Sequence, residues 1–366
     1  MKIFISAAEP SGDLIAAEVM QCCPKETRFI GIGGVEMAKH GLQSLFPMEE
    51  LSVMGFLEVI PRAIKILRRI KETADYIIKE QPDAVLTVDA YSFHSRMAKH
   101  LRKLGYTGKL HHYVPPAVWA WKEGRAKSLA QLYDRVYCIF PFEPPYFLRH
   151  GIQADFVGHP AAFRERETDS HFYDKHDLDS TPILLLLPGS RVQEINKLLP
   201  VFIQAAKQIQ QQTPVQVVIP TLPHLEPLIQ QYCQSEQFVA TVLTTTEDRF
   251  QSFKQAKGAI AASGTVAMEL ALNQVPTVIG YKTSAVTYWI ARRFANVKYA
   301  TVLNIIAGRE IIPEFLQDRC SPENLAQAAL SFFENPYQVQ DIINITEQLK
   351  SPLGLKPQEI VAQHIL

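Results

Sequence analysis

Two turns in the second half of the chain carry residues that could bind phosphate. In the first, Pro188-Gly189-Ser190-Arg191 follows the apolar run Ile183–Leu187 and leads into a helical pattern. The first N–H groups of such a helix suit an anion, and the guanidinium of Arg191 can form paired hydrogen bonds with phosphate oxygens. A cation is otherwise disfavoured in the first turn of a helix, so Arg191 itself indicates a bound anion. Ser190 and Gln193 have the spacing of a capping box, which predicts that the helix is capped at Ser190.

The second turn, Ala262-Ser263-Gly264-Thr265, follows a short apolar run from Gly258 to Ile260. Small residues at this turn let a ligand approach the backbone. Glu269 lies about one helical turn further on, where its carboxylate could accept hydrogen bonds from a ribose. Taken alone, the turn is explained as well by an ordinary strand-to-helix connection with Ser263 as the N-cap. Two phosphate-type turns in one parallel sheet together indicate a nucleotide diphosphate.

Asp89 is the candidate general base. It follows the apolar run Ala84–Val88, so we expect it at the carboxyl end of a buried strand, where open α/β sheets bind ligands. There its carboxylate would face the crevice between two domains and could accept a proton from a substrate. Capping of the helix that starts near Ser92 explains the same position equally well.

Further candidates in the first half of the chain would surround a second substrate. Ser11, Gly12 and Asp13 follow the first predicted strand and are candidates for the same reason as Asp89, with plain helix capping as the alternative. Trp119 and Trp121 stand in a stiff, proline-containing loop just before a group of basic residues. Aromatic rings beside cations suit a sugar or a phosphate, but they also suit a contact between domains.

A stretch between residues 53 and 71 combines apolar and basic residues in a way that could dock on an anionic membrane or a lipid. The residues of this expected patch are Met54, Phe56, Leu57, Arg62, Lys65, Arg68, Arg69 and Lys71. The acidic residue close by is Glu72, and each basic residue near an anionic surface contributes on the order of 1 kcal/mol. A core helix with a solvated basic face is the alternative interpretation.

Short apolar runs alternate with helical patterns along the whole chain, which predicts parallel sheets covered by helices. The expected strands are Ile3–Ser6, Phe29–Ile32, Ala84–Val88, Leu110–Val114, Val136–Phe140, Ala154–Val157, Ile183–Leu187, Val215–Ile219, Val239–Leu243, Gly258–Ala261 and Thr277–Tyr281. The stretch 164–181 is dense in charge and lacks apolar periodicity, as is typical of a connection. We therefore expect two doubly wound, Rossmann-like α/β domains, 1–163 and 182–335, with a cleft between them and a tail, 336–366, that returns to the first domain.

The amino-acid composition limits which kinds of partner and which metal sites this chain can have. The 366 residues contain 37 Lys and Arg and 37 Asp and Glu, and a net charge of zero argues against a nucleic-acid binder that works by bulk electrostatics. The five cysteines include no C-x-x-C pair and no zinc spacing, which fits a reduced cytosolic chain. His111 and His112 alternate along a predicted strand, so they cannot readily bind one metal.

The motifs together resemble lipid-A-disaccharide synthase, a family of cytosolic, membrane-associated glycosyltransferases of the GT-B architecture. The resemblance covers nearly the whole chain and is carried by Glu9–Asp13, Ser52–Val59, Val118–Trp121, Pro141–Glu143, Phe156–Pro160, Leu187–Arg191, Ala262–Thr265 and Asn304–Glu310. The tryptophan motif and the segment from Asn304 are the most specific of these. The family joins UDP-2,3-diacylglucosamine to 2,3-diacylglucosamine 1-phosphate, releasing UDP and forming a β-1,6 disaccharide.

The resemblance implies a role for each candidate residue. UDP would bind the second domain, at the residues Ser190, Arg191, Ser263, Gly264, Thr265, Glu269, Asn304 and Arg309. The acceptor sugar would bind the first domain at Ser11, Gly12, Asp13, Trp119 and Trp121, and Asp89 would take the proton of its 6-hydroxyl. No metal or other cofactor is expected. The enzyme would work in the cytoplasm with a peripheral contact to the anionic inner membrane, and its oligomeric state is left open.

The chain departs from the family pattern beside the proposed base. The family usually continues its catalytic aspartate with Ala-Pro-Asp-Phe-Asn, whereas Asp89 is followed by Ala90-Tyr91-Ser92-Phe93-His94. The tryptophan loop begins Val114-Pro115-Pro116-Ala117 in place of Val-Ser-Pro-Ser, and Leu303 replaces the usual proline before Asn304. Asp89 itself is kept, but its altered neighbours make its role as the catalytic base less certain to carry over from the family.

Two other functions fit the same residues. A UDP-sugar 2-epimerase would share the architecture and the donor site but would have no use for an apolar acceptor surface. A non-catalytic nucleotide-sugar sensor would keep Arg191 and Glu269 and would have no use for Asp89.

Overall fold

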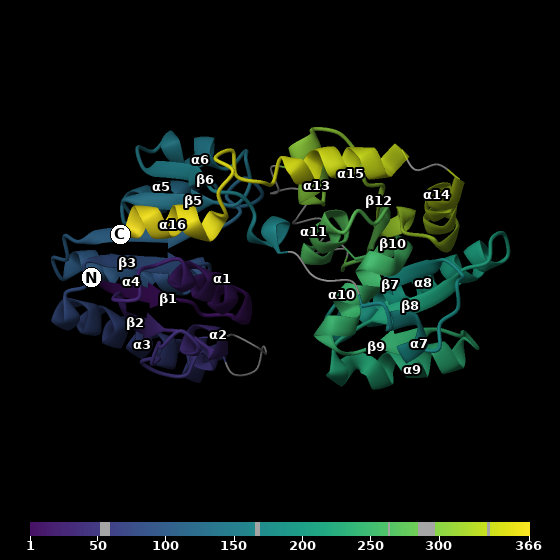
Figure 1. Ribbon diagram of the computed structural model, residues 1–366, viewed down its shortest axis with the longest axis horizontal. Coiled ribbons are helices and arrows are strands. Elements are labelled where there is room, and N and C mark those ends of the chain that lie inside the picture. The colour runs from purple at the N-terminus through teal and green to yellow at the C-terminus, as the bar shows by residue number, and fades with distance from the viewer. Residues whose placement is uncertain (52–58, 165–168, 263, 285–296, 335–336) are drawn as a thin grey trace. The chain divides into compact units, whose positions relative to one another are not determined.

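The computed structural model describes residues 1–51, 59–164, 169–262, 264–284, 297–334 and 337–366, and of 59–63, 265, 334, 337 and 338 it describes the backbone alone. The chain divides into two compact units (Figure 1). One unit is Met1–Phe163 together with Leu349–Leu366, and the other is Arg164–Gln348. Each unit contains one six-stranded sheet.

The sheet of the first unit has the order β2-β1-β3-β4-β5-β6, and all its neighbouring strands are parallel. Its strands are β1 (Lys2–Ser6), β2 (Arg28–Ile32), β3 (Ala84–Val88), β4 (Lys109–Tyr113), β5 (Arg135–Cys138) and β6 (Gln153–Phe156). All five residues of β3 are buried, as a continuous apolar run requires when both faces of the sheet are covered. Since β1 pairs with β2 on one side and β3 on the other, the order of strands reverses between β1 and β3.

Helices cover both faces of this sheet. On one face, α1 (Pro10–Gln21), α2 (Val35–Ala38) and α16 (Pro357–Ile365) share a core with residues such as Ile5 and Leu86. On the other, α3 (Val59–Glu80), α4 (Tyr91–Lys103), α5 (Gly124–Ala130) and α6 (Pro144–Leu148) share a core with residues such as Phe4 and Val85. Neighbouring residues of one strand thus belong to opposite cores, as the two-residue period of a strand requires.

The sheet of the second unit has the order β12-β11-β10-β7-β8-β9 and is also parallel throughout. Its strands are β7 (Ile183–Leu187), β8 (Gln216–Pro220), β9 (Thr241–Leu243), β10 (Ala256–Ala261), β11 (Thr277–Tyr281) and β12 (Glu314–Leu316). The helices α8 (Val192–Gln210), α9 (Glu226–Ser235) and α14 (Pro322–Glu334) share one core, and α10 (Thr246–Gln255) and α11 (Thr265–Leu272) pack on the sheet outside that core. The order reverses between β7 and β10, as in a Rossmann sheet.

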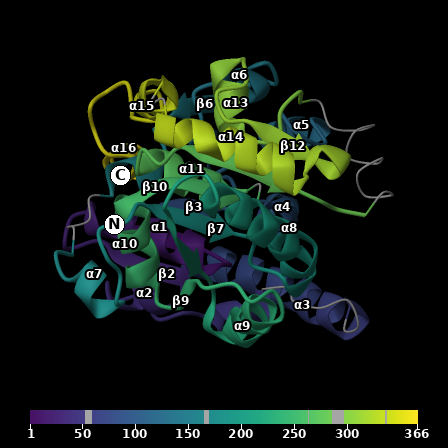
Figure 2. The same ribbon diagram turned by 90° about the vertical axis from the view of Figure 1, so that its right-hand side faces the viewer.

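The C-terminal tail does not belong to one unit as a whole. Helix α15 (Tyr337–Glu347) packs on α11 and on α13 (Val302–Ala307) in the second unit. From Leu349 the chain belongs to the first unit, where the carbonyl of Leu349 accepts a hydrogen bond of 2.8 Å from the His159 N–H. Helix α16 then packs on α1, and the two chain termini lie side by side in both views (Figure 1, Figure 2). The expected tail 336–366 is therefore divided, because the apolar face of α15 is covered by helices of the second unit.

The strands predicted from apolar runs are all present; β3, β7 and β11 have the predicted bounds, and the ends of the others differ by one or two residues. β12 was not predicted, because three residues that begin with Glu314 do not form an apolar run. The connection expected at 164–181 contains a short helix, α7 (Phe172–Lys175), which packs on α10 and lies in the second unit. The ammonium group of Lys175 lies 2.5 Å from the carboxylate of Asp248 on α10.

Three buried histidines make the first unit sensitive to acid. Burial lowers the pKa of His94 and of His111 to about 4, and that of His112 to about 3. An unfolded histidine titrates near pH 6.5, so between about pH 4 and 6.5 the unfolded chain binds more protons than the folded one. These histidines therefore contribute a rise of the free energy of unfolding with pH in this window. Burial raises the pKa of Glu143 to about 7, and this group acts in the opposite direction.

We therefore predict that His111→Phe flattens the rise of the unfolding free energy near pH 5 by about 1.4 kcal/mol per pH unit. Urea denaturation can be followed by the fluorescence of Trp119 and Trp121 in a Trp289→Phe background. Tyr137→Phe is the control, because it removes the hydroxyl that lies 2.7 Å from Nδ1 of His111 but keeps the histidine. Parallel slopes in His111→Phe and its parent would contradict the prediction.

Candidate functional site

Several of the predicted site residues lie where the strand order of each sheet reverses. In the first unit Glu9–Asp13 follow β1, and Asp89 follows β3. In the second, Gly189–Arg191 follow β7, and Gly264 follows β10. Loops at such a point turn to opposite faces of the sheet and leave space for a ligand at the carboxyl ends of the strands.

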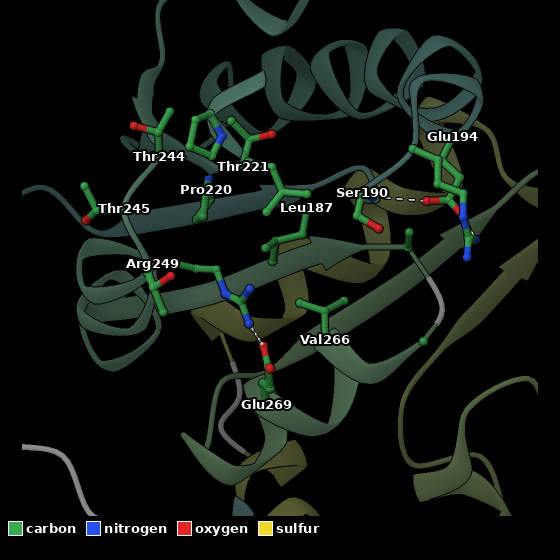
Figure 3. Close-up of a pocket in the computed structure, with 17 residues that line it drawn as sticks. Leu187, Ser190, Glu194, Pro220, Thr221, Thr244, Thr245, Arg249, Val266 and Glu269 are labelled. Atoms are coloured by element: carbon green, nitrogen blue, oxygen red, sulfur yellow. Dashed lines mark hydrogen bonds and ion pairs between the residues drawn. The ribbon is translucent and has the colours of Figure 1, made fainter. Parts of the chain in front are cut away.

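A pocket of about 480 Å³ opens at this edge of the second sheet (Figure 3). Four strand-to-helix loops line it, those that follow β7, β8, β9 and β10. The lining residues are Leu187, Gly189, Ser190, Arg191, Glu194, Pro220, Thr221, Leu222, Pro223, Thr244, Thr245, Thr246, Arg249, Ala262, Gly264, Val266 and Glu269. The size suits a ligand of the class of a nucleotide.

The turn after β7 is organised by Glu194. Gly189 has a φ of 112°, and a Cβ at this position would lie 2.4 Å from Oε2 of Glu194, so the position requires glycine. The N–H of Ser190 donates to Oε2 of Glu194 at 3.1 Å, and Nη1 of Arg191 lies 3.0 Å from Oε1. Arg191 is the N-cap of α8, in an extended conformation.

Two expectations about this turn change as a result. The capping box of Ser190 and Gln193 is not formed, because the helix begins one residue later and Glu194 takes the Ser190 N–H. The charge of Arg191 at the helix start is balanced by Glu194, so its position alone does not require a bound anion. The Arg191 side chain is 77% exposed and is therefore accessible to a ligand of the pocket.

The turn after β10 begins α11 at Gly264. This residue has a φ of 136°, and a Cβ built on it would meet nothing within 4 Å. The backbone is therefore open to a ligand at the helix N-terminus. Two of the predicted contacts of this turn, Ser263 and the side chain of Thr265, lie outside the described residues.

Glu269 lies in the pocket as predicted, but its carboxylate pairs with Arg249 from α10 (Figure 3). The guanidinium of Arg249 lies 5.0 Å from the ring centre of Phe250 and 5.6 Å from that of Phe253. Its buried Nε has no hydrogen-bond partner among the described residues. Arg249 was missed from the sequence, because a single arginine in a helix carries no signal of its own.

Asn304 and Arg309 were expected to complete this site and lie outside the pocket lining. The fully buried Asn304 amide donates to the Ile312 carbonyl at 2.8 Å and to Glu314 at 2.7 Å, and its oxygen accepts the N–H groups of Ile311 and Ile312. With both ends of the amide engaged, it shapes the segment before β12. Arg309 instead pairs with Asp341 of α15 at 2.6 Å.

In the first unit, Asp89 begins a strained turn at the end of β3. Asp89 and Ala90 have φ values of 53° and 43°, and Val114, after β4, has 62°. Such values are rare for residues other than glycine and most unusual for a β-branched one, and they gather at functional sites. The Asp89 N–H donates to the Tyr113 carbonyl at 2.8 Å, and Oδ1 accepts the Ala90 N–H at 2.7 Å.

Two effects act on the charge of the Asp89 carboxylate. Burial raises its pKa, and the hydrogen bond from the Ala90 N–H opposes that rise. Burial and the charge of Asp89 likewise raise the pKa of Glu9, which follows β1. A raised pKa makes a carboxylate a stronger base. Glu9 belongs to the first motif, but the sequence did not identify it as a neighbour of Asp89.

The three predicted residues after β1, Ser11, Gly12 and Asp13, lie in different environments. Asp13 is buried and accepts the N–H groups of Gly34 at 2.6 Å, Glu36 at 2.9 Å and Met37 at 3.3 Å. It therefore caps α2, and not the helix α1 in which it lies. A Cβ at Gly12 would make only ordinary contacts, at 3.4 Å from Cβ of Ala7 and 3.5 Å from the Val88 carbonyl oxygen, so packing does not require glycine there. Ser11 is exposed.

The tryptophan loop is held by Glu143. The Trp119 indole N–H donates to Oε1 of this buried carboxylate at 3.1 Å, and Oε2 accepts the N–H groups of Ile139 and Phe140 at 3.1 Å each. The Trp119 ring also packs edge-on against Phe142 at 5.3 Å. Trp121 is partly exposed, and Nζ of Lys122 lies 6.0 Å from its ring centre. Both rings are partly exposed, and the Trp119 ring is held by its hydrogen bond to Glu143.

Comparison with known proteins assigns the chain to a family. A family model described as lipid-A-disaccharide synthetase matches residues 3–365. A lipid-A-disaccharide synthase of Rhodospirillum centenum is 38% identical over 376 aligned positions, which cover 100% of this chain and 94% of the relative. The chain belongs to the lipid-A-disaccharide synthetase family. This membership confirms the resemblance drawn from the motifs.

Solved structures at low identity share the fold of this family member. A UDP-GlcNAc 2-epimerase from Neisseria meningitidis bound to UDP-GlcNAc superimposes with a TM-score of 0.67 at 12% identity, covering 100% of this chain and 99% of its own. A glycosyltransferase from Rickettsia africae gives a TM-score of 0.59 at 12% identity, covering 100% and 98%. The predicted α/β fold of two parallel-sheet domains is confirmed.

The basic stretch of this family member is partly neutralised. Nε of Arg69 lies 2.7 Å from Glu50 and Nη1 lies 2.7 Å from Glu72, and Nζ of Lys65 lies 3.3 Å from Glu50. The acidic partner Glu50 was not foreseen, because it precedes the helix by many residues. Arg69 is only 14% exposed and belongs to the structure of the unit rather than to a free patch.

The other residues of the expected patch fall into two groups, those that are exposed and those that lie outside the described residues. Ile64 and Leu67 are 66% and 57% exposed, and the neighbouring Arg68 and Lys71 are also exposed. The predicted residues Met54, Phe56 and Leu57 and the side chain of Arg62 lie outside the described residues. Within the described part of the chain, no helix is both long and apolar enough to cross a bilayer. The same residues include no cluster of three or more His, Cys, Asp or Glu side chains that could hold a metal ion.

Proposed function

We propose that the chain is an inverting glycosyltransferase that joins UDP-2,3-diacylglucosamine to 2,3-diacylglucosamine 1-phosphate. The products are a β-1,6-linked tetraacyl-disaccharide 1-phosphate and UDP. Family membership supports the substrates, and the observation that carries the chemistry is the partly buried Asp89 carboxylate at the strand reversal of the first sheet. A sensor of nucleotide sugars has no need of such a group.

The donor occupies the pocket of the second unit in this proposal. Its diphosphate binds the open backbone at Gly264 and the guanidinium of Arg191. We assign the residues on either side of Gly264 in the sequence, Ser263 and Thr265, to the same diphosphate contact. Its ribose hydroxyls bind Glu269. Since Glu269 also pairs with Arg249, the ribose either shares or displaces that partner.

The acceptor binds the first unit beside Ser11 and Gly12, with the rings of Trp119 and Trp121 against the sugar. Its 6-hydroxyl oxygen attacks the anomeric carbon of the donor, forming the new C–O bond as the bond from that carbon to the β-phosphate oxygen breaks. Asp89 accepts the hydroxyl proton, and UDP leaves with the electron pair. Attack opposite the leaving group gives the β product.

Charge on the departing UDP is stabilised by the helix N-terminus at Gly264 and by Arg191, as preorganised donors do in other sites. In this reaction the protein groups alone stabilise the departing UDP, and no step uses a metal ion. We therefore predict that turnover persists at an unchanged rate in excess EDTA, measured as UDP release with both diacylated substrates. A loss that added Mg²⁺ restores would contradict this assignment.

Release of UDP tests the proposed function against its alternatives. A transferase releases UDP from the acylated donor only when the lipid acceptor is present. A 2-epimerase converts its nucleotide sugar, or releases UDP from it, without any acceptor. A sensor binds the nucleotide sugar and releases no UDP from it. Acceptor-independent UDP release would favour the epimerase, with which the chain shares its fold alone at 12% identity.

Asp89→Asn should lower kcat by roughly 10²- to 10⁴-fold, the usual contribution of a general base. The affinity for UDP should stay unchanged, because the pocket belongs to the other unit. Asp75→Asn makes the same change at an exposed position of α3 and should have no effect on either quantity. Steady-state kinetics and calorimetry measure both. A near-normal kcat for Asp89→Asn would remove the base from this residue.

Substitutions in the pocket should weaken UDP itself. Loss of a charge-assisted hydrogen bond costs about 1.5–3 kcal/mol, so Arg191→Ala should raise the Kd of UDP by roughly 10- to 150-fold, and Glu269→Ala somewhat less. Salt should weaken the Arg191 contribution, because this side chain is 77% exposed. Lys197→Ala, an exposed cation of the same helix, is the control. Unchanged UDP affinity in Arg191→Ala would show that the diphosphate lies elsewhere.

We also propose that the enzyme acts in the cytoplasm and contacts the inner membrane through the exposed face of α3. Two apolar side chains, Ile64 and Leu67, lie near two exposed cations there, Arg68 and Lys71. Apolar insertion together with attraction to anionic lipids gives reversible binding. A diacylated substrate could leave the bilayer at such a face.

Arg68→Gln with Lys71→Gln should reduce sedimentation with anionic vesicles at low salt, by about 1 kcal/mol for each charge, or roughly 30-fold together. Lys99→Gln with Lys103→Gln removes the same charge from exposed positions of α4 and is the matched control. Binding of the parent should also be lost at high salt. Equal binding of the two double variants would move the membrane contact to another surface.

A further inference from the structure

A buried chain of hydrogen bonds runs beneath the turn that carries Asp89. Nδ1 of His94 lies 2.7 Å from the backbone carbonyl oxygen of Asp89, and Nε2 lies 2.9 Å from Oγ of Ser6. Ser6 ends β1 and His94 is in the first turn of α4, and both side chains are fully buried. The two strands that meet at the reversal of the sheet, β1 and β3, are thus joined through one imidazole.

The partners determine which nitrogen carries the proton. A backbone carbonyl can only accept, so Nδ1 must be the N–H donor to Asp89. In the neutral ring Nε2 then accepts, and the Ser6 hydroxyl donates to it. Burial lowers the pKa of His94 to about 4, so the ring is neutral at physiological pH. Both ring nitrogens are hydrogen-bonded within the protein and the side chain is fully buried, which argues against His94 as the general base itself.

The turn needs an outside constraint. Asp89 and Ala90 both have left-handed backbone conformations, each of which costs about 1–3 kcal/mol and persists only where its surroundings impose it. His94 contacts this turn twice. Its backbone N–H donates to the Ala90 carbonyl at 3.2 Å, and its ring donates to the Asp89 carbonyl.

The ring of His94 is itself held in place. It lies edge-on to Phe93, at 5.4 Å between ring centres, and to His112, at 6.3 Å. The Tyr133 hydroxyl donates to the His94 backbone carbonyl at 3.1 Å. Nδ1 of His112 lies 2.8 Å from Oγ1 of Thr87, the β3 residue that pairs with Ser6. A rigid ring can transmit its position to the turn, whereas a mobile one cannot.

We propose that His94 is a positioning residue, whose Nδ1–H fixes the Asp89 carbonyl and thereby the direction of the Asp89 carboxylate. This inference rests on the proposed role of Asp89 as the base. It explains how the altered segment Ala90-Tyr91-Ser92-Phe93-His94 can still support that role. Displacing a reacting group by about 1 Å can cost roughly 10²-fold in rate, so the effect of losing the donor should be large.

The amide variants of His94 separate its two hydrogen bonds. His94→Asn places an N–H near the position of Nδ1 and should keep kcat within about 5-fold of the parent. His94→Gln places its amide near Nε2, towards Ser6, loses the donor to Asp89 and should lower kcat by about 10²-fold. The KM for the donor and the Kd of UDP should stay unchanged in both, because the pocket is in the other unit. Equal kcat values for His94→Asn and His94→Gln would overturn the inference.

A double variant distinguishes this inference from the proposed function. If Asp89 is the base, His94→Gln should have little further effect on kcat in an Asp89→Asn background, since the two act as a unit. A slow Asp89→Asn with a normal His94→Gln would overturn the positioning role and leave the base role intact. A normal Asp89→Asn would overturn the base role itself.

The tautomer can be measured without altering His94. In protein labelled with ¹⁵N-histidine, the His94 resonances should show a protonated Nδ1 and an unprotonated Nε2 between pH 6 and 8. Ser6→Ala should leave Nδ1 protonated and change kcat by less than about 5-fold, because the bond to Asp89 remains. A protonated Nε2 in the parent protein would overturn the inference.

Discussion

The reversal of strand order in each parallel sheet determines where the loops that carry the candidate site separate from one another. Parallel strands cannot be joined by tight turns, so every connection crosses one face of the sheet. Where the order reverses, neighbouring connections leave towards opposite faces and their first residues separate. Both sheets of this chain have one such point, between β1 and β3 and between β7 and β10. The carboxylate with a raised pKa lies at the first, and the pocket opens at the second.

The first unit maintains its site at a cost in stability. Two successive left-handed residues, Asp89 and Ala90, are strained, and the polar groups buried beneath them lose contact with water. The hydrogen bonds of Ser6, His94 and Thr87 compensate for much of that desolvation. Nε2 of His112 has no partner among the described residues, so the compensation is incomplete there. A buried polar network of this kind fixes a single arrangement because few alternatives satisfy its members.

The sequence was sufficient for the sheets because burial on both faces leaves a clear pattern. Runs such as Ala84–Val88 and Ile183–Leu187 contain no polar interruption, and each became a strand with the predicted bounds. The strand β12 was missed because its first residue, Glu314, is buried through hydrogen bonds to Thr301 and Asn304, and a sequence pattern does not show such bonds.

The candidate site was harder to predict than the fold, since residue type indicates what a side chain can do and not which partner it has. Asp13 and Asn304 have the chemistry of ligand contacts, but their hydrogen-bonding groups are taken by backbone amides and by Glu314. Arg249 gives no signal until folding brings it to Glu269. Arg69 appeared free because Glu50 is distant in sequence. The residues after β1, β3, β7 and β10 lie at the strand reversals because topology, which the sequence does predict, determines their place, and their roles stay predictions.

The covalent structure of the product is the sharpest test of the proposed glycosyl transfer. Both diacylated substrates, UDP-2,3-diacylglucosamine and 2,3-diacylglucosamine 1-phosphate, should be incubated with the full chain and the lipid product analysed by mass spectrometry and proton NMR. The account predicts a tetraacyl-disaccharide 1-phosphate whose anomeric proton and inter-ring correlations identify a β-1,6 linkage. A product with retained α configuration, or an altered donor sugar with no disaccharide, would contradict it.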